Sequence, residues 1–276
     1  MKTIRPRTWK GFIKAIDDIR SEYGVYSRVL DSGETYVRNN LILFRGQSDQ
    51  AWELATTLER KTKEQFHVTK YMRLVKRAVS EIESFTGANW NTPPYPELET
   101  EIKDKQDVFT VHLPCYDYLV YLRHHGFPSP LLDWTESPFI AAYFAYISNT
   151  KNNPAVYCYI ERPASVKGGT GGDPLISLKG PFVKTHKRHF AQKAWYTVAT
   201  KWNSSEEKHN FLPHEKVFSK NNPKQDILIK IVIPNKCRDE ALHYLNDHNI
   251  NHFTLFQSED SLIKAIETKE FDINNV

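Results

Sequence analysis

"LILFRG", residues 41–46, is a short apolar run that ends in an arginine and a glycine. The first four residues predict a buried strand, because short apolar runs bounded by such breaks are typical of strands covered on both faces. Arg45 carries five donors in a planar fork that matches phosphate and carboxylate groups. Gly46 lets a ligand or a second backbone approach closely. Two interpretations follow: Arg45 binds a ligand at a pocket rim, or it pairs with a carboxylate and fastens the strand end.

Residues 122–145, LRHHGFPSPLLDWTESPFIAAYFA, are the second informative stretch. Asp133 follows two leucines, so we expect it to be drawn toward the interior, where a carboxylate needs donors. The candidate donors are Arg45, His124 and His125. The alternative is that Asp133 caps a turn and that the two histidines merely end a helix.

A helix start lies in the same stretch. Ser137 fits the N-cap position and Pro138 the first helical position. Thr135 and Ser137 flank one residue and point the same way if the chain is extended. Both residues are therefore candidates for a site, with a purely capping role for Ser137 as the alternative.

Residues 187–202, KRHFAQKAWYTVATKW, are the most basic local segment. Gln192 precedes a predicted strand, and its amide can orient a substrate as donor and acceptor without carrying charge. Cations interleaved with aromatic side chains suit a phosphate-bearing partner. A solvated strand edge is the alternative interpretation.

The pattern of apolar residues predicts an α+β fold. We expect helices near residues 9–19, 61–85, 114–126, 137–149, 237–250 and 258–271, and strands at 41–44, 155–161, 194–200, 226–234 and 252–257. Residues 87–100, 127–136 and 167–174 are expected to be irregular or loop. Helices and strands mix without a βαβ rhythm, so we expect a mixed, largely antiparallel central sheet with helices around it. We expect a single domain over residues 1–276, with an N-terminal helical extension at 1–30 and a helical insertion at about 61–100.

Composition limits the classes of protein that the chain can belong to. The formal net charge is +4 with interspersed charges, which neither indicates nor excludes a nucleic-acid partner. Three separated cysteines without a CxxC pair suit a reducing compartment. No apolar stretch reaches the roughly 20 residues that span a bilayer. We expect a soluble cytoplasmic protein that does not enter a membrane. No HExxH, Walker-type or dinucleotide motif is present, and we expect no metal site.

These stretches resemble the FRG domain family, which is named for a Phe-Arg-Gly motif. Phe44, Arg45 and Gly46 match that motif, and the blocks at residues 124–145, 188–199 and 231–262 resemble later family blocks. The similarity covers roughly residues 25–270. Two departures are visible: many members have Thr-Arg where Ser129-Pro130 stands, and Pro-Asp-Leu-Asp-Gly where residues 257–261 read QSEDS.

A more distant likeness is to ADP-ribosyltransferases of the Arg–Ser–Glu class. The resemblance implies an ADP-ribosyltransferase-like fold with NAD as substrate. On this basis we expect Arg45, Gly46 and Thr135 to bind NAD, and His124 and His125 to orient Asp133 or contact the diphosphate. The resemblance also implies that Ser137, Asp133 and Gln192 act at the ribose. Gln192 stands where the class carries glutamate, and a neutral amide cannot supply that charge. Asp133 would then supply it, with Glu259 or Asp260 as the fallback.

Three functions follow as expectations. The first is an NAD-dependent ADP-ribosyltransferase or NAD-glycohydrolase-like effector, a bacterial or phage toxin or an antiviral protein by the family's associations. Its acceptor would be protein, nucleic acid or water. The second is a non-catalytic module that binds nucleic acid or protein and holds Arg45 and Asp133 as a buried ion pair. The third is a metal-dependent nuclease built on Asp133, Glu136 and the histidines.

Overall fold

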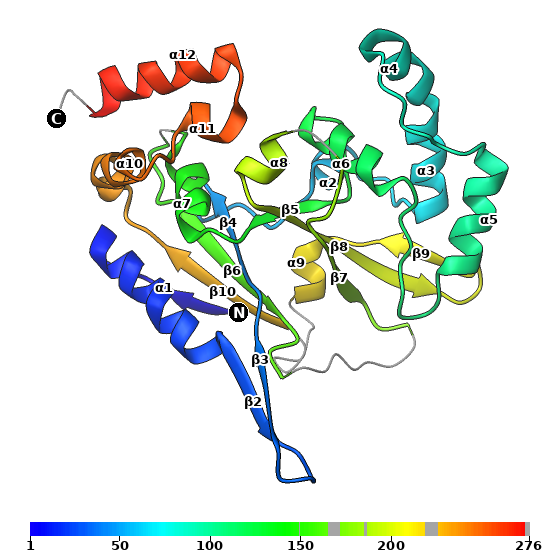
Figure 1. Cartoon of the computed structure of the whole chain (residues 1–276), viewed down its shortest axis with the longest axis horizontal. Coiled ribbons are helices and arrows are strands. Elements are labelled where there is room, and N and C mark those ends of the chain that lie inside the picture. Colours follow the sequence, from blue (N-terminus) through cyan, green and yellow to red (C-terminus); the bar gives the residue numbers. More distant parts are fainter. Residues whose placement is uncertain (149, 165–171, 185–186, 219–225, 274–276) are drawn as a thin grey trace.

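The computed structural model describes residues 1–148, 150–164, 172–184, 187–218 and 226–273. Within these residues, eight strands form one sheet in the order β1-β10-β6-β4-β5-β8-β7, with β9 paired to β8 (Figure 1). The strands are β1 (Lys2–Ile4), β4 (Ile42–Gln47), β5 (Leu132–Thr135), β6 (Ala155–Glu161), β7 (Leu175–Lys179), β8 (Ala194–Asn203), β9 (Lys208–Phe211) and β10 (Asp226–Val232). β1 pairs parallel to β10 and the other pairings are antiparallel. The prediction of an α+β fold with a largely antiparallel sheet is confirmed.

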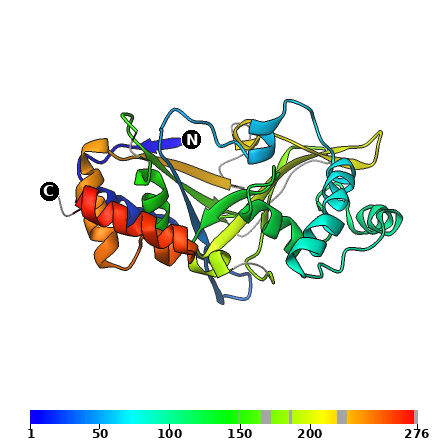
Figure 2. The ribbon, with the colours of Figure 1, turned by 90° about the horizontal axis from the view of Figure 1, so that it is seen from above.

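Helices gather at the two ends of the sheet (Figures 1 and 2). One group contains α1 (Trp9–Tyr23), α7 (Pro138–Tyr146), α10 (Arg238–Asp247), α11 (His252–Phe256) and α12 (Glu259–Thr268). The other contains α3 (Val68–Arg77), α4 (Val79–Thr86), α5 (Tyr95–Lys105) and α6 (Tyr116–His124). The short helices α2 (Thr57–Lys61), α8 (Lys187–Ala191) and α9 (His214–Phe218) lie between them. The helical turn Asn235–Cys237 precedes α10, and the helical turn Lys269–Ile273 follows α12 at the end of the described chain. Helix α7 of the first group lies directly on the central strand β4.

Strand β4 is buried because its side chains alternate between two apolar clusters. Phe44 packs with α1, α7 and α10, whereas Leu43 packs on the opposite face with Tyr157 and Trp134. A period of two along the strand produces this division. Arg45 follows Leu43 on the second face, so the fold places a guanidinium where an apolar residue would otherwise continue the core.

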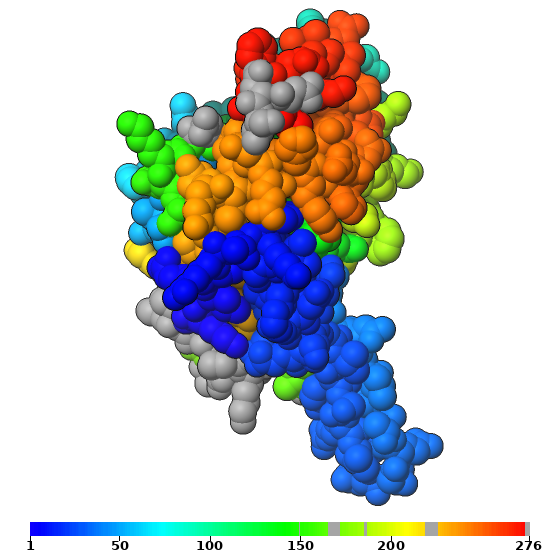
Figure 3. All heavy atoms as spheres, turned by 90° about the vertical axis from the view of Figure 1, so that its left-hand side faces the viewer, coloured from blue at the N-terminus to red at the C-terminus, as the bar shows by residue number. Residues whose placement is uncertain are grey.

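The first thirty residues do more than extend the domain. β1 adds an edge to the sheet, and α1 buries Trp9 and Phe12 in the core. A hairpin of β2 (Val25–Val29) and β3 (Thr35–Asn39), which the sequence pattern did not predict, projects from the body (Figure 3). Residues 1–30 are thus partly strand, and only α1 confirms the expected helix.

Four local predictions are wrong. The expected helix at 61–85 is not continuous: α3 and α4 occupy most of it and meet at Ala78, and residues 62–67 are not helical, with the backbone oxygen of Phe66 accepting from the amide of Phe211. The expected loop at 87–100 contains the start of α5, and the expected irregular segment at 127–136 contains β5. The expected strand at 252–257 is α11, which a capping box at Asn251 and Thr254 begins. The glycine-rich stretch at 167–174 falls mostly outside the described residues.

Within the described part of the chain, no helix is both long and apolar enough to cross a membrane.

Candidate functional site

The site lies where β4 and β5 separate. β4 pairs with β6 along its whole length but with β5 only at Phe44 and Thr135. The two strands diverge beyond that pair, and a cavity of about 330 Å³ opens between them. Its volume is at the low end of the roughly 300–1,000 Å³ that is usual for small-molecule sites. The cavity is lined by Phe44, Arg45, Gly46, Gln47, Ser48, Trp52, Arg60, Arg123, His124, Asp133, Trp134, Thr135, Ala141, Phe144, Arg188, Gln192, Ala194, Tyr196 and Phe256.

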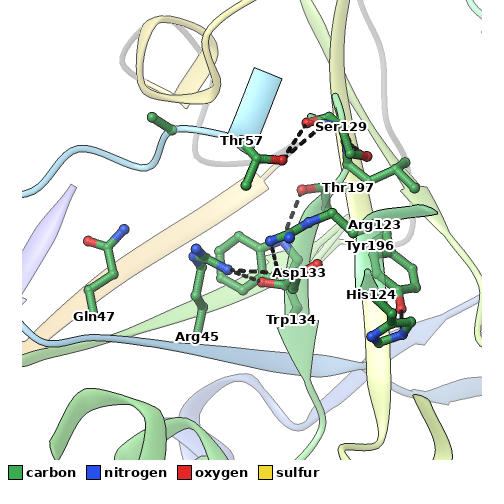
Figure 4. Close-up of polar contacts among 12 residues, drawn as sticks. Arg45, Gln47, Thr57, Arg123, His124, Ser129, Asp133, Trp134, Tyr196 and Thr197 are labelled. Carbon is green, nitrogen blue, oxygen red and sulfur yellow. Dashed lines mark hydrogen bonds and ion pairs between the residues drawn. The ribbon is translucent and has the colours of Figure 1, made fainter. Parts of the chain in front are cut away.

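Arg45 from β4 and Arg123 from α6 converge on Asp133 of β5 (Figure 4). Nη2 of Arg123 donates to Oδ2 of Asp133. Nη1 of Arg45 donates to the backbone oxygen of Asp133 at 2.9 Å and lies 3.6 Å from Oδ2. Arg123 therefore makes the direct carboxylate hydrogen bond, while Arg45 is anchored mainly on the backbone.

This arginine–aspartate cluster (Arg45, Arg123 and Asp133) carries more positive than negative charge. The two arginine side chains are 13% and 15% exposed and the carboxylate 36%. Burial lowers the pKa of Arg45 to about 10, against the opposing effect of Asp133. The Nε atoms of both arginines are buried without a hydrogen-bond partner among the described residues. Two largely buried guanidiniums share one carboxylate, so an anion entering the cavity would be attracted to them.

Two further arginines and several aromatic rings complete the cavity wall. Arg60 lies at the end of α2, and Arg188 of α8 donates to the backbone oxygen of Phe256 at 3.2 Å. The Arg188 guanidinium also lies 5.3 Å from the centre of the Phe256 ring. Phe144 contacts the same ring edge-on at 6.0 Å. Among the described residues that line the cavity, Asp133 is the only one with a carboxylate, and the lining carries a net positive charge.

His124 lies in a hydrogen-bonded chain of three side chains. Its Nε2 is 2.9 Å from the hydroxyl of Tyr196, which is 3.1 Å from Nδ1 of His189. Nε2 of His189 is in turn 2.7 Å from the backbone oxygen of Pro181. Tyr196 and His189 are buried, whereas His124 is partly exposed and lines the cavity. The chain thus connects the cavity to the protein interior.

Three predicted site residues have a structural partner that explains them. A Cβ at position 46 would lie 1.8 Å from the backbone oxygen of Ala141, so Gly46 makes room for α7, and it also lines the cavity. Ser137 is the N-cap of α7, accepts from the amide of Ile140 and is not in the cavity lining. Thr135 lines the cavity and accepts from the amide of Ser137.

Some of the other predicted residues line the cavity, and some lie outside it. Gln192 lines the cavity and donates to the backbone oxygen of Leu255 at 3.1 Å. His125 ends α6, packs on Tyr121 and is not in the lining. Glu259 and Asp260 lie in the first turn of α12, likewise outside the lining. The structure brings together Arg45, His124, Asp133, Thr135 and Gln192, with Gly46 at the edge.

Sequence reasoning missed Arg123 as a site residue. It lies in the last turn of α6, ten residues before Asp133, within a stretch that is notable in the sequence for its histidines. The only available signal was an arginine close in sequence to a carboxylate that needed donors. Arg60 was missed because nothing in the sequence linked α2 to the other site residues. Arg188 and Tyr196 belong to the basic segment 187–202, which the sequence linked to a phosphate-bearing partner but not to a cavity shared with Arg45 and Asp133.

Buried polar contacts hold β5 in place beside the cavity (Figure 4). Trp134 donates to the hydroxyl of Thr197 on β8 at 2.8 Å, and Thr197 contacts His214 of α9 at 3.0 Å. Thr57 of α2 accepts from the amide of Ser129 at 2.9 Å, which fixes the segment leading into β5. The carboxylate of Asp133 is therefore presented from a rigid support.

Acid is expected to destabilise the fold through its histidines. Burial lowers the pKa of five described histidines, namely His67, His125, His189, His209 and His252. The unfolded chain takes up these protons near pH 6.5, whereas the folded chain takes them up only at lower pH. The free energy of unfolding should therefore fall as the pH falls below about 6.5. Urea unfolding at pH 7.5 and pH 5.5 measures this, and equal or higher stability at pH 5.5 would contradict it.

Comparison with known proteins bears on the family alone. No curated protein and no solved structure matches the chain. Within the described residues, no group of three or more His, Cys, Asp or Glu side chains is arranged to hold a metal ion, and the nuclease stays an untested prediction. Residues 40–154 match the family model of the FRG domain. That stretch includes Phe44, Arg45 and Gly46 together with Arg123 and Asp133, so the resemblance to the FRG domain family is confirmed over residues 40–154.

Proposed function

We propose that the cavity between β4 and β5 binds NAD and that the protein cleaves the bond between nicotinamide and ribose. ADP-ribose would pass to protein, nucleic acid or water. The observation that carries the proposal is the arginine–aspartate cluster, in which two largely buried guanidiniums face one carboxylate inside a cavity. Such a site offers both a grip for phosphate and a negative charge for the ribose.

The phosphates of NAD suit the cations of the cavity. Arg45 has a buried Nε without a hydrogen-bond partner among the described residues, and its contact with the Asp133 carboxylate is long. It can therefore bind a phosphate without giving up a short carboxylate hydrogen bond. Arg188 and Phe256 form a stacked pair that suits a ring of the ligand. The cavity volume of about 330 Å³ suits part of a dinucleotide, with the rest extending from its mouth.

The ribose chemistry falls to Asp133. When the C1′–N bond breaks, its electron pair goes to nicotinamide, and the cationic ring becomes neutral while positive charge develops at C1′. A carboxylate at that point stabilises the transition state by electrostatics. Arg123 holds the carboxylate in one orientation through Oδ2. Gln192 also lines the cavity and would hydrogen-bond the ribose hydroxyls, a role that needs no charge.

Consumption of NAD would make such a protein a toxin or an antiviral effector. A cytoplasmic location fits the three free thiols of Cys115, Cys158 and Cys237.

The second candidate is a binding module without catalysis. The two arginines that neutralise Asp133 favour it, because a carboxylate paired in this way stabilises a neighbouring cation less well. Its ligand would be the same kind of phosphate-bearing molecule. The two candidates differ in one result: the module binds ADP-ribose but leaves NAD intact.

Binding is tested by calorimetric titration with ADP-ribose, which cannot be cleaved at the nicotinamide bond. We expect Arg45→Gln to weaken binding about 10- to 100-fold, because a hydrogen bond to a charged group contributes about 1.5–3 kcal/mol. Arg77→Gln is the matched control, since Arg77 is an exposed residue of α3 and is not in the lining. If Arg45→Gln and the wild type bound ADP-ribose with equal affinity, the cavity would not be the binding site.

A further inference from the structure

Trp52 presents an exposed indole at the cavity. The residue lies on the segment between β4 and α2, lines the cavity and is 53% exposed. An exposed fraction this large comes mainly from the indole, because the backbone is a small part of the surface of a tryptophan. No aromatic ring among the described residues stacks on it. The indole is therefore available to a ligand that extends from the cavity mouth.

Hydrogen bonds hold the backbone on both sides of Trp52. The amide of Gln50 donates to the backbone oxygen of Asn153 at 2.9 Å. Nε2 of Gln47 donates to the backbone oxygen of Glu53 at 3.1 Å. The segment is thus fixed before a ligand binds, and a ring presented from a fixed backbone loses less conformational freedom on binding.

The order of the strands places Trp52 and Asp133 on opposite sides of Arg45. Arg45 pairs with Tyr157 of β6, and paired residues project from the same face of a sheet. β4 lies between β6 and β5, so Tyr157 flanks Arg45 on one side and Asp133 on the other. The hydroxyl of Tyr157 donates to the backbone oxygen of Trp52 at 3.3 Å. The segment that carries the indole therefore lies on the Tyr157 side of Arg45.

Arg60 adds a further cation near Arg45. It lies near the end of α2 and lines the cavity. Burial is the main cause of the lowered pKa of Arg45, and the positive charges of Arg123 and Arg60 lower it further, so Arg60 is within electrostatic reach of Arg45. Nη1 of Arg60 donates to the backbone oxygen of Ala55 at 3.2 Å, and no carboxylate of the described residues forms an ion pair with it. Its other donors can bind a phosphate.

We propose that Trp52 and Arg60 form the subsite for the adenosine diphosphate half of NAD, with the adenine ring stacked on the indole. This inference rests on the proposed function and names how NAD lies in the site. The parts of NAD follow in the order nicotinamide ribose, diphosphate and adenosine. Across the sheet, Asp133, Arg45 and Trp52 follow in the matching order. The cavity of about 330 Å³ holds only part of a dinucleotide, so the adenine extends to the indole at its mouth.

Calorimetric titration with ADP-ribose and with ribose 5-phosphate tests the subsite, because only ADP-ribose carries adenine. We expect Trp52→Ala to weaken binding of ADP-ribose about tenfold and of ribose 5-phosphate less than about twofold, since the variant loses a base–aromatic stack. Trp52→Phe should bind ADP-ribose within about threefold of wild type, because phenylalanine also stacks. Phe85→Ala is the control, since Phe85 is an exposed aromatic residue of α4 outside the lining.

Fluorescence and kinetics report the stack more directly. A purine stacked on an indole quenches its emission, and the difference between wild type and Trp52→Phe isolates Trp52 among the six tryptophans. We expect ADP-ribose to quench that difference signal. Arg60→Gln should weaken binding about tenfold and keep the quenching at saturation. In nicotinamide release, Trp52→Ala should raise KM for NAD about tenfold with kcat within about twofold, because the stack is the same in the ground and transition states.

Two results would overturn the inference. The first is a Trp52→Ala variant with wild-type affinity for ADP-ribose, which would place the adenine elsewhere. The second is an equal loss of affinity for ADP-ribose and ribose 5-phosphate, which would mean that Trp52 shapes the cavity and contacts no ring of the ligand. If the wild type binds ADP-ribose through Trp52 but releases no nicotinamide, the proposed cleavage fails and the subsite stands.

Discussion

Gly46→Ala is expected to destabilise the protein by about 3 kcal/mol, close to the upper end of the usual cost of overpacking. The added Cβ would lie 1.8 Å from the backbone oxygen of Ala141 and 2.7 Å from the backbone nitrogen of Ala145. Both atoms belong to α7, whose residues Ala141 and Ala145 are buried in the core. Backbone atoms of a packed helix cannot rotate away as a side-chain end can, so α7 or β4 must shift.

Urea unfolding measures this effect. Gly180→Ala is the matched control, because its Cβ would lie 3.8 Å from the Trp195 ring, an ordinary contact. We expect the control to change the free energy of unfolding by less than about 0.5 kcal/mol. A Gly46→Ala variant as stable as wild type would show that β4 and α7 lie further apart than described. The glycine of the Phe-Arg-Gly motif would then still be open to a ligand role.

Asp133→Asn is expected to separate binding from cleavage. The amide keeps the size of the side chain and can still accept from Arg123, but it removes the negative charge beside the two guanidiniums. We expect nicotinamide release to fall about 10²- to 10³-fold, the usual cost of removing one electrostatic contribution to a transition state. Affinity for ADP-ribose should rise about tenfold, because the ligand phosphates then meet two arginines without a competing carboxylate.

Calorimetry with ADP-ribose and the release assay measure the two effects on one preparation, and circular dichroism confirms that the variant is folded. Glu259→Gln is the control, since Glu259 lies in the exposed first turn of α12 and is not in the lining. Weaker ADP-ribose binding by Asp133→Asn, with release unchanged, would mean that Asp133 holds the site together and takes no part in the chemistry.

Sequence patterns anticipated the parts of the site that depend on short-range chemistry. The N-cap of α7 at Ser137 followed from a serine before a proline and an apolar run, and the structure has that cap. The expectation that Asp133 is drawn toward the interior and needs donors led to Arg45 as one candidate, and the two form an ion pair in the structure. The sequence also offered His124 and His125 as donors to Asp133, but the hydrogen bond to its carboxylate comes from Arg123.

The parts that failed depend on long-range pairing. β5 has four residues, with a charged residue in its middle, and its strand conformation comes from pairing with β8. Nothing local in LDWT marks a strand, because the pattern neither alternates cleanly nor runs apolar. α11 shows the reverse: the β-prone residues of HFTLFQ are overruled by the capping box at Asn251.

The separation of β4 from β5 could not be predicted either. It follows from a register with one residue pair, which depends on how β4 pairs with β6 and β5 with β8. The cavity, and the meeting of Arg123, Arg188 and Tyr196 around it, result from that register. Residue types in the sequence can indicate a phosphate site, but only the sheet shows which residues share it.

The most direct test of the account is the release of nicotinamide from NAD by the purified protein, followed over time beside Arg45→Gln and Asp133→Asn. The account predicts steady release by the wild type and losses of about tenfold or more in both variants. No release by a folded wild type that binds ADP-ribose, with candidate protein and nucleic-acid acceptors added, would contradict it and leave the cavity as a binding site alone.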